Sequence, residues 1–267
     1  MSDYLLRFGG ISRLYGKNNM PLLQQAHFCV IGIGGVGSWI AEALARNGIG
    51  NITLIDLDDI CTTNINRQIH ALTSTIGQDK VSVMAERIKQ INPECCVHEI
   101  DDFVTEENLE QLMSSPFDYI IDAIDSVNIK TRLIAYCKRN KRSIITIGGA
   151  GGQIDPSHIK ICDLSQTYQD PLLAKVKNQL RREHNFPSAK ITKKSKAKFG
   201  IDAVFSSEQL RYPDEDGNVS YEKQAQNKTM RLDCSGGFGA TTHVTACFAF
   251  FAVSKTIEKF LKKQVKI

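Results

Sequence analysis

The feature that most restricts the fold is a glycine-rich segment, residues 32–37, which directly follows a short apolar run ending at Ile31. It fits G-x-G-x-x-G, in which the first glycine permits a tight turn, the second lets the backbone approach a phosphate, and the third allows close helix packing. Residues 38–47 then have helical spacing, and Gly48 ends them. A strand, a glycine turn and a helix in this order predict a nucleotide-phosphate site at the helix N-terminus.

Strand and helix patterns continue to alternate after this unit. Helical spacing is clearest over residues 80–91, and apolar runs of strand length lie at 27–31, 52–55, 97–100, 119–121 and 143–147. Strands separated by helices indicate a parallel sheet. We predict an α/β fold, with a Rossmann-like, doubly wound, mainly parallel sheet. Length alone allows one domain or two, and we predict a single domain over residues 1–267 with a basic and polar insertion, 164–232, before the last helix.

Composition limits the class of protein. With 42% apolar residues and a net charge of +4, the chain is neither globally disordered nor charged like a typical nucleic-acid-binding protein. Its eight cysteines show no disulfide framework, which favours a reducing, cytoplasmic setting. Residues 236–253 carry no charge and approach the length of a membrane span, but their threonines and His243 favour a core helix, followed by a basic amphipathic tail.

Positive charge is concentrated in residues 174–200, which carry nine Lys and Arg and one acidic residue, Glu183. A solvated loop explains such a run, but the same charge can also bind RNA phosphates without reading sequence. Residues 210–229 are rich in turn formers and are expected to form a long loop or a hairpin. The RNA contacts that we expect lie beside Phe199: Lys193, Lys194, Lys196 and Lys198.

Polar residues follow the predicted strands at the carboxyl end of the sheet, where such sheets bind ligands. Asp56 closes the second strand, where a carboxylate can accept ribose hydroxyls. The glycine turn does not distinguish a dinucleotide site from a triphosphate site. A triphosphate bound with magnesium, however, needs fixed cations for its oxygens and a carboxylate for the metal. Arg67 and Lys80 are candidates for the cations and Asp125 for the carboxylate. Considered one at a time, each of these three residues is more simply explained as a solvated surface charge.

In their order, these residues resemble the ATP-dependent activating-enzyme superfamily, which includes ubiquitin-activating enzymes and the adenylyltransferases of thiamine and molybdopterin sulfur carriers. Within it the sequence is most similar to the tRNA threonylcarbamoyladenosine dehydratases, over nearly the whole chain. The motifs that carry the resemblance are the glycine turn, Asp56-Leu57-Asp58, Asn64-x-x-Arg67-Gln68, Lys80, Ile91-Asn92-Pro93 and Asp122-Ala123-Ile124-Asp125-Ser126, with more specific stretches at 7–10, 13–16, 66–72, 148–156 and 233–240.

The resemblance implies a set of ATP contacts, with Asp125 beside Mg²⁺. An N-terminal arginine of this superfamily often reaches the ATP of the partner subunit, which implies a homodimer; Arg13 is favoured over Arg7. Arg67, Lys80, Asp125, Arg13 and Cys234 are the implied catalytic residues. The residues implied around ATP are Gly32, Gly34, Gly35, Gly37, Asp56, Asp58, Asn64, Arg67, Gln68 and Lys80.

The cysteines depart from the sulfur-carrier adenylyltransferases, which usually hold zinc with paired C-x-x-C motifs. None of the eight has that spacing, so we predict no zinc site. Cys234, beside a glycine cluster and an acid, is a candidate nucleophile that would accept an acyl group as a thioester. A structural role for it, or a role with a cysteine desulfurase partner, stays open, as does a monovalent cation (Na⁺ or K⁺) near the glycine loops.

The function that the resemblance implies is ATP-dependent dehydration of threonylcarbamoyladenosine next to the tRNA anticodon, by adenylation of the threonyl carboxylate and intramolecular ring closure. One alternative is adenylation of the C-terminus of a ubiquitin-like sulfur carrier. Another is a non-catalytic nucleotide-binding scaffold for a sulfur-transfer partner, against which the predicted clamp of Arg67, Lys80 and Asp125 argues. A nicotinamide-dependent dehydrogenase is a more distant alternative.

Overall fold

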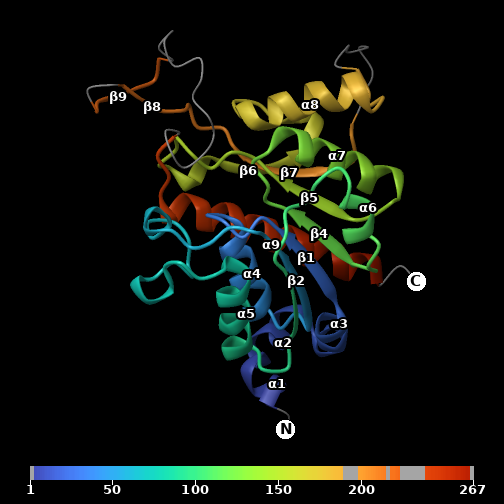
Figure 1. Ribbon diagram of the computed structural model, residues 1–267. Helices are drawn as coiled ribbons and strands as arrows, with labels where there is room; N and C mark the ends of the chain where they lie inside the picture. The colour runs from blue at the N-terminus through green and yellow to red at the C-terminus, as the bar shows by residue number, and fades with distance from the viewer. Residues whose placement is uncertain (1–2, 189–197, 215–216, 223–237, 265–267) are drawn as a thin grey trace.

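The computed structural model describes residues 3–188, 198–214, 217–222 and 238–264. Its centre is a seven-stranded sheet in the order β3-β2-β1-β4-β5-β7-β6 (Figure 1). Neighbouring strands are parallel except β6 and β7, which are antiparallel, so the predicted doubly wound, mainly parallel sheet is confirmed. The strands are β1 (His27–Ile31), β2 (Asn51–Ile55), β3 (Cys96–Ile100), β4 (Tyr119–Asp122), β5 (Ile144–Ile147), β6 (Ile159–Asp163) and β7 (Asp202–Ser206).

Helices cover both faces of the sheet (Figure 1). Along β1 the side chains alternate between two apolar cores: Phe28 and Val30 belong to one, Cys29 and Ile31 to the other. The first core is closed by α1 (Asp3–Arg7), α3 (Met20–Gln25), α4 (Gly37–Arg46), α5 (Lys80–Ile91) and α9 (Thr242–Gln264), with α2 (Gly9–Tyr15) beside α1 and α3. The second core is closed by α6 (Leu109–Leu112), α7 (Val127–Arg139) and α8 (Pro171–Glu183).

Short elements complete the described chain. Residues 212–220 contain an antiparallel pair of strands, which agrees with the predicted loop or hairpin. The strands are β8 (Tyr212–Pro213) and β9 (Val219–Ser220), and the 3₁₀ turns are η1 (Lys17–Asn19), η2 (Thr62–Asn64), η3 (Thr73–Thr75), η4 (Pro156–His158) and η5 (Leu164–Gln166).

The strand order reverses direction at β1, which pairs with both β2 and β4. In this register Ile31 lies beside Ile55 on one side and beside Asp122 on the other. The loops that follow these strands start at the same edge of the sheet, and Gly32 N donates to Ile55 O while Ala123 N donates to Ile31 O, each at 2.9 Å. Such a reversal creates the crevice in which α/β proteins bind ligands.

The basic stretch is only partly a loop, because residues 174–183 lie in α8. Leu172, Leu173, Val176 and Leu180 of this helix are buried in the second core, so its charges are the outer face of an amphipathic helix. The segment 164–232, which we predicted as an insertion, therefore contributes strand β7 to the sheet and helix α8 to the second core. Likewise α9 continues through the expected basic tail as a single helix, and in the described ranges no helix has the length and apolarity that crossing a membrane requires.

Candidate active site

The glycine turn after β1 brings backbone segments unusually close together. Gly32 has a φ of +86°, and a Cβ at this position would lie 2.9 Å from Ala123 O. A Cβ on Gly37 would lie 1.7 Å from Gly32 O, an impossible contact. These glycines let α4 start directly against β1 and the loop after β4, as the motif predicts.

Gly34 and Gly35 lie at a more open part of the same turn. A Cβ on Gly34 would lie 3.9 Å from Gln68 Nε2, and one on Gly35 would lie 3.3 Å from Arg67 Cγ. The positive end of the α4 dipole is directed toward this turn. Backbone amides and a helix N-terminus together suit a phosphate group.

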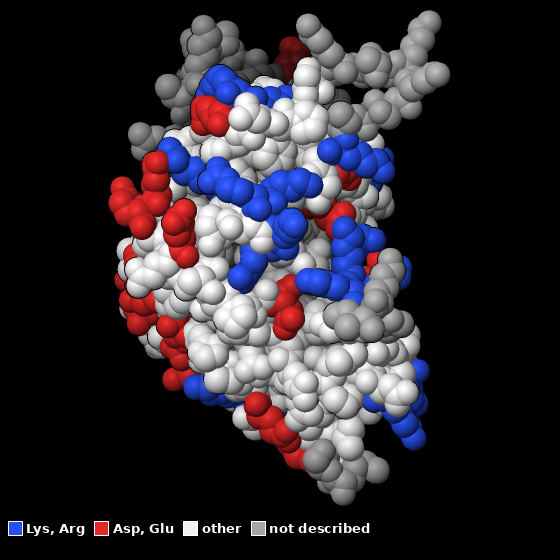
Figure 2. Space-filling model, turned by 90° about the vertical axis from the view of Figure 1, so that its right-hand side faces the viewer, with Lys and Arg blue, Asp and Glu red and all other residues white. Residues whose placement is uncertain are grey.

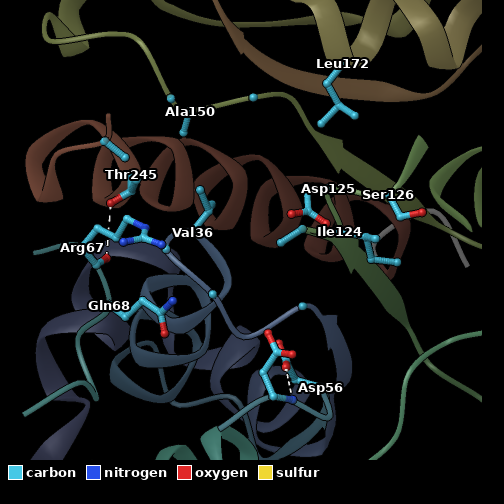
Figure 3. Close-up of a pocket in the computed structure, with 18 of the residues that line it drawn as sticks. Val36, Asp56, Arg67, Gln68, Ile124, Asp125, Ser126, Ala150, Leu172 and Thr245 are labelled. Atoms are coloured by element: carbon cyan, nitrogen blue, oxygen red, sulfur yellow. Dashed lines mark hydrogen bonds between the residues drawn. The ribbon is translucent and has the colours of Figure 1, made fainter. Parts of the chain in front are cut away.

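A cavity of about 1100 Å³ opens in front of this turn, and Figure 3 shows side chains pointing into it from several loops. It is large enough for a nucleotide together with part of a second substrate. The walls come from the carboxyl ends of β1, β2, β4 and β5, from α9 and from the segment before α7. The predicted residues among its lining are Gly32, Gly34, Gly35, Asp56, Asp58, Arg67, Gln68, Lys80 and Asp125.

Asp56 and Lys80 form the floor of the cavity. Asp56 Oδ2 accepts a 2.5 Å hydrogen bond from Ile33 N, and its Oδ1 accepts one of 2.9 Å from Asp58 N. Lys80 Nζ lies 2.6 Å from Asp58 Oδ2 and 3.8 Å from Asp56 Oδ1. Burial raises the pKa of Asp56, and Lys80 and the two backbone N–H groups oppose that rise. Lys80 thus holds two carboxylates in place beside the cavity.

Arg67, Gln68 and Thr245 form one wall (Figure 3). The carbonyl oxygen of Arg67 accepts hydrogen bonds from Trp39 Nε1 at 3.1 Å and Thr245 Oγ1 at 3.4 Å, which ties the loop after η2 to α4 and α9. Gln68 is 5% exposed, and its Oε1 has no hydrogen-bond partner among the described residues. A buried polar atom without a partner is costly, so the wall is complete only when a ligand or water binds there.

Asp125 lies across the cavity, on the exposed loop between β4 and α7 (Figure 3). The fully buried Asp122 anchors this loop: its Oδ1 accepts from Ile124 N at 3.1 Å, and its Oδ2 accepts from Thr146 Oγ1 at 2.7 Å. Lys130 Nζ, also fully buried, lies 2.9 Å from the same Oδ2. A buried ion pair with satisfied oxygens therefore fixes the position from which Asp125 enters the cavity.

Asp170 anchors the neighbouring loop after β5. Its Oδ2 accepts from Gly149 N at 3.0 Å and its Oδ1 from Leu173 N at 2.9 Å, so one carboxylate caps α8 and holds a cavity-lining glycine. Burial raises the pKa of Asp170, and the hydrogen bonds from Leu173 and Gly149 and the charge of Lys130 oppose this. Sequence reasoning missed Asp170, Lys130 and Thr245, although a lysine on the apolar side of α7 was a usable signal.

Some predicted residues lie elsewhere. Asn64 is buried and does not line the cavity; its Oδ1 accepts from Cys61 N at 3.0 Å. Gly37 likewise serves packing, not the cavity wall. Arg13 is exposed on α2, among the N-terminal helices, which pack at the end of α4 opposite the glycine turn (Figure 1). Neither it nor Arg7, which pairs with Asp3 at 2.5 Å, lines the cavity of its own chain.

Other predictions fall outside the described residues: Cys234, Lys193, Lys194 and Lys196. Lys198 is described and exposed. No cluster of three or more His, Cys, Asp or Glu that would suit a metal ion occurs in the described ranges. Asp125 can still suit Mg²⁺, because that ion is usually held by one or two carboxylates together with substrate phosphates.

His70 gives the site region a pH-dependent stability. It is 1% exposed, and neither ring nitrogen has a hydrogen-bond partner among the described residues. Burial, and then the charges of Lys80 and Arg87, lower the pKa of His70 from 6.5 to about 4. As the pH falls, the unfolded chain therefore takes up this proton first, and the folded state loses stability below about pH 6.5.

The loss should reach about 2 kcal/mol at pH 5, since each pKa unit corresponds to about 1.4 kcal/mol. Urea unfolding at pH 7 and pH 5 measures it in the wild type and in His70→Leu, which lacks the titrating group. An equal pH dependence in both proteins would show that His70 is not its source.

Comparisons with known proteins agree with this geometry. The model of the ThiF family matches residues 10–266. A tRNA threonylcarbamoyladenosine dehydratase of Haemophilus influenzae is 55% identical over 264 residues, 99% of this chain and 97% of that protein. A crystal structure of E. coli tRNA N6-threonylcarbamoyladenosine dehydratase in complex with ATP is similar with a TM-score of 0.86 and 52% identity, covering 99% of this chain and 98% of that one. The complex of that protein with AMP also has a TM-score of 0.86 and 52% identity, covering 100% and 98%. The resemblance indicated by the motifs is confirmed.

Proposed function

The chain belongs to the ThiF family, and on that basis we propose that it is an ATP-dependent enzyme that dehydrates threonylcarbamoyladenosine next to the anticodon of tRNA. The observation that carries the proposal is a cavity with a glycine turn and Arg67 on one side, Lys80 on its floor and Asp125 across from them. The names of the similar proteins supply the substrate, and their ATP and AMP complexes agree with a nucleotide in this cavity.

The reaction has two steps. An oxygen of the threonyl carboxylate attacks the α-phosphorus of ATP, the bond to the β-phosphate breaks, and pyrophosphate leaves. The carbamoyl group then attacks the activated carbonyl carbon and loses a proton, while AMP leaves with the former carboxylate oxygen. The substrate thus loses one water to form a ring. Because both reacting groups belong to one side chain, ring closure is favoured by their proximity.

Each part of the cavity has a role in this scheme. The amides around Gly34 and Gly35 bind phosphate oxygens, and Arg67 and Lys80 offset the charge that develops on the transferring phosphate. Asp56 accepts ribose hydroxyls with the lone pairs that its backbone hydrogen bonds leave unused. Asp125 would hold Mg²⁺, which supplies charge neutralisation on the phosphates when bound.

A homodimer is part of the same proposal, with Arg13 of one chain reaching the ATP of the other. What supports a dimer is an unusual exposure of apolar side chains: Leu6 and Leu14 are 66% and 74% exposed, and Phe250 and Phe251 on α9 are 46% and 40% exposed. A cytoplasmic location and a cysteine desulfurase partner remain predictions from the sequence, as do a monovalent cation near the glycine loops and a direct role for Cys234.

The proposal is tested by incubating the protein with ATP and tRNA that carries threonylcarbamoyladenosine, then analysing the nucleosides by mass spectrometry. We expect the modified nucleoside to become lighter by one water only when ATP is present. A parallel pyrophosphate-exchange assay with a ubiquitin-like sulfur carrier tests the alternative. Exchange with the carrier and an unchanged nucleoside would overturn the proposal.

A further inference from the structure

The helices α7 and α8 carry an unbalanced positive charge at one end. They lie side by side, and Gln179 Nε2 of α8 donates to Asn128 Oδ1 of α7 at 3.2 Å. Helix α7 has no acidic residue, and α8 has only Glu183. The cations gather in and just after the last turns, and we call this group the basic end: Lys138, Arg139, Lys141, Arg142, Arg181 and Arg182.

The residues after α8 lie at the same place. Arg181 packs over the ring of Phe199 at 5.2 Å, and the ideal Cβ position of Gly200 lies 2.8 Å from Lys138 Nζ. Lys198, one of the predicted RNA contacts, directly precedes Phe199 in the chain and therefore lies at the edge of the basic end. Figure 2, which views the molecule from the side toward which α7 and α8 run, shows Lys and Arg side chains gathered over the middle of this face, with acidic side chains mainly along one edge.

Helix dipoles explain part of this charge, because cations are favourable in the last turn of a helix. They do not explain Lys141, which lies beyond α7; Arg142, also beyond α7, is half-buried, donates to Ser115 O and lies over the Phe117 ring. Within the described chain the side chains of Lys138, Arg139 and Lys141 have no hydrogen-bond or ion-pair partner. In the basic tail of α9 the cations are mostly paired, Lys255 and Lys262 with Glu258 and Lys259 with Asp202, whereas among the described residues of the basic end the paired cation is Arg182, with Glu183.

The lengths of α7 and α8 fix the distance between the basic end and the cavity. Ser126, directly before α7, and Pro171, the first residue of α8, both line the cavity. Each helix has 13 residues, so its C-terminal end lies about 20 Å from the cavity. A nucleoside reacting in the cavity would place phosphates several nucleotides away near these cations.

We infer that the basic end of α7 and α8 is a docking surface for the phosphate backbone of the substrate tRNA, holding the stem while the modified nucleoside enters the cavity. This inference rests on the proposed function. Contacts of this kind fix orientation without reading bases and make affinity depend strongly on salt.

The test compares two double charge reversals of equal net charge. Arg139→Glu/Lys141→Glu changes the basic end, and Lys17→Glu/Lys89→Glu, at exposed positions on η1 and α5, is the control. The Kd for tRNA is measured by fluorescence anisotropy over a salt series. We expect the first variant to bind at least about tenfold more weakly and to lose about two units of the slope of log Kd against log salt, and the control to stay within about twofold of wild type.

Two further measurements keep the result interpretable. The ATP-induced rise in Tm should be unchanged in both variants, which shows that the fold and the nucleotide site are intact, and Arg182→Glu on α8 should weaken tRNA binding in the same direction. Equal tRNA affinity and equal salt slope in the two double variants would overturn the docking surface. A wild type that binds tRNA through these residues but does not dehydrate it would instead overturn the proposed function alone.

Discussion

Replacing Lys80 with methionine is expected to lower ATP-dependent turnover by about 10²–10³-fold, the usual effect of removing one preorganised charge from a reacting phosphate or oxyanion. The ammonium group lies between Asp56 and Asp58 at the floor of the cavity. Its loss removes the cation that we propose for the phosphate site and leaves two carboxylates that repel the nucleotide. Both kcat and the Kd for ATP should therefore change, as measured by AMP release and by calorimetric titration.

Lys89→Met is the matched control, since Lys89 is exposed on the same helix, α5. It should keep wild-type turnover. If Lys80→Met also kept turnover within about twofold of wild type, the role of this lysine in the reaction would be wrong.

Replacing Lys130 with methionine is expected to destabilise the folded chain by about 3–5 kcal/mol, because it leaves the charge of Asp122 buried without a counter-charge. Both side chains are fully buried and 2.9 Å apart. The free energy of unfolding, measured in urea at neutral pH, gives this loss directly. The exposed Lys138 of the same helix is the control position, and Lys138→Met should change stability by less than about 0.5 kcal/mol.

A second replacement separates the ion pair from simple packing. In Lys130→Met/Asp122→Asn the uncompensated charge is gone, so much of the lost stability should return. A double variant no more stable than the single one would mean that shape, not charge, makes Lys130 necessary.

Much of the fold could be predicted because its signals are local. The glycine turn, the apolar run before it and the spacing of 80–91 specify strand, turn and helix within short windows, and the structure starts and ends α5 at Lys80 and Ile91 as predicted. Helix α8 was harder to see, because it has as many charged residues as apolar ones and the basic composition hides the buried positions Leu173 and Val176. Two strands of the sheet were not predicted: Lys160 interrupts the short apolar run of β6, and β7 begins at a charged residue, Asp202, although its other side chains are buried.

The candidate site likewise contains some residues that local sequence predicts and others that only the folded chain brings together. Asp125 follows β4, Lys80 opens α5 and Arg67 lies in the connection between β2 and α5, and parallel topology brings such positions to one edge. Asp170 and Thr245 come from segments far along the chain, and only the folded sheet places Asp170 beside the loop after β5 and Thr245 beside Gly35. Asn64 is buried and its side chain accepts from the backbone at Cys61, and its contact with ATP stays a prediction from the sequence.

The proposed reaction depends on one step, in which a carboxylate of the substrate attacks the α-phosphorus of ATP in this cavity. It is tested most directly with tRNA whose threonyl carboxylate carries a heavy oxygen isotope, followed by mass spectrometry of the nucleotide products. We expect one labelled oxygen in AMP and none in pyrophosphate. Label in pyrophosphate or inorganic phosphate, with unlabelled AMP, would contradict it.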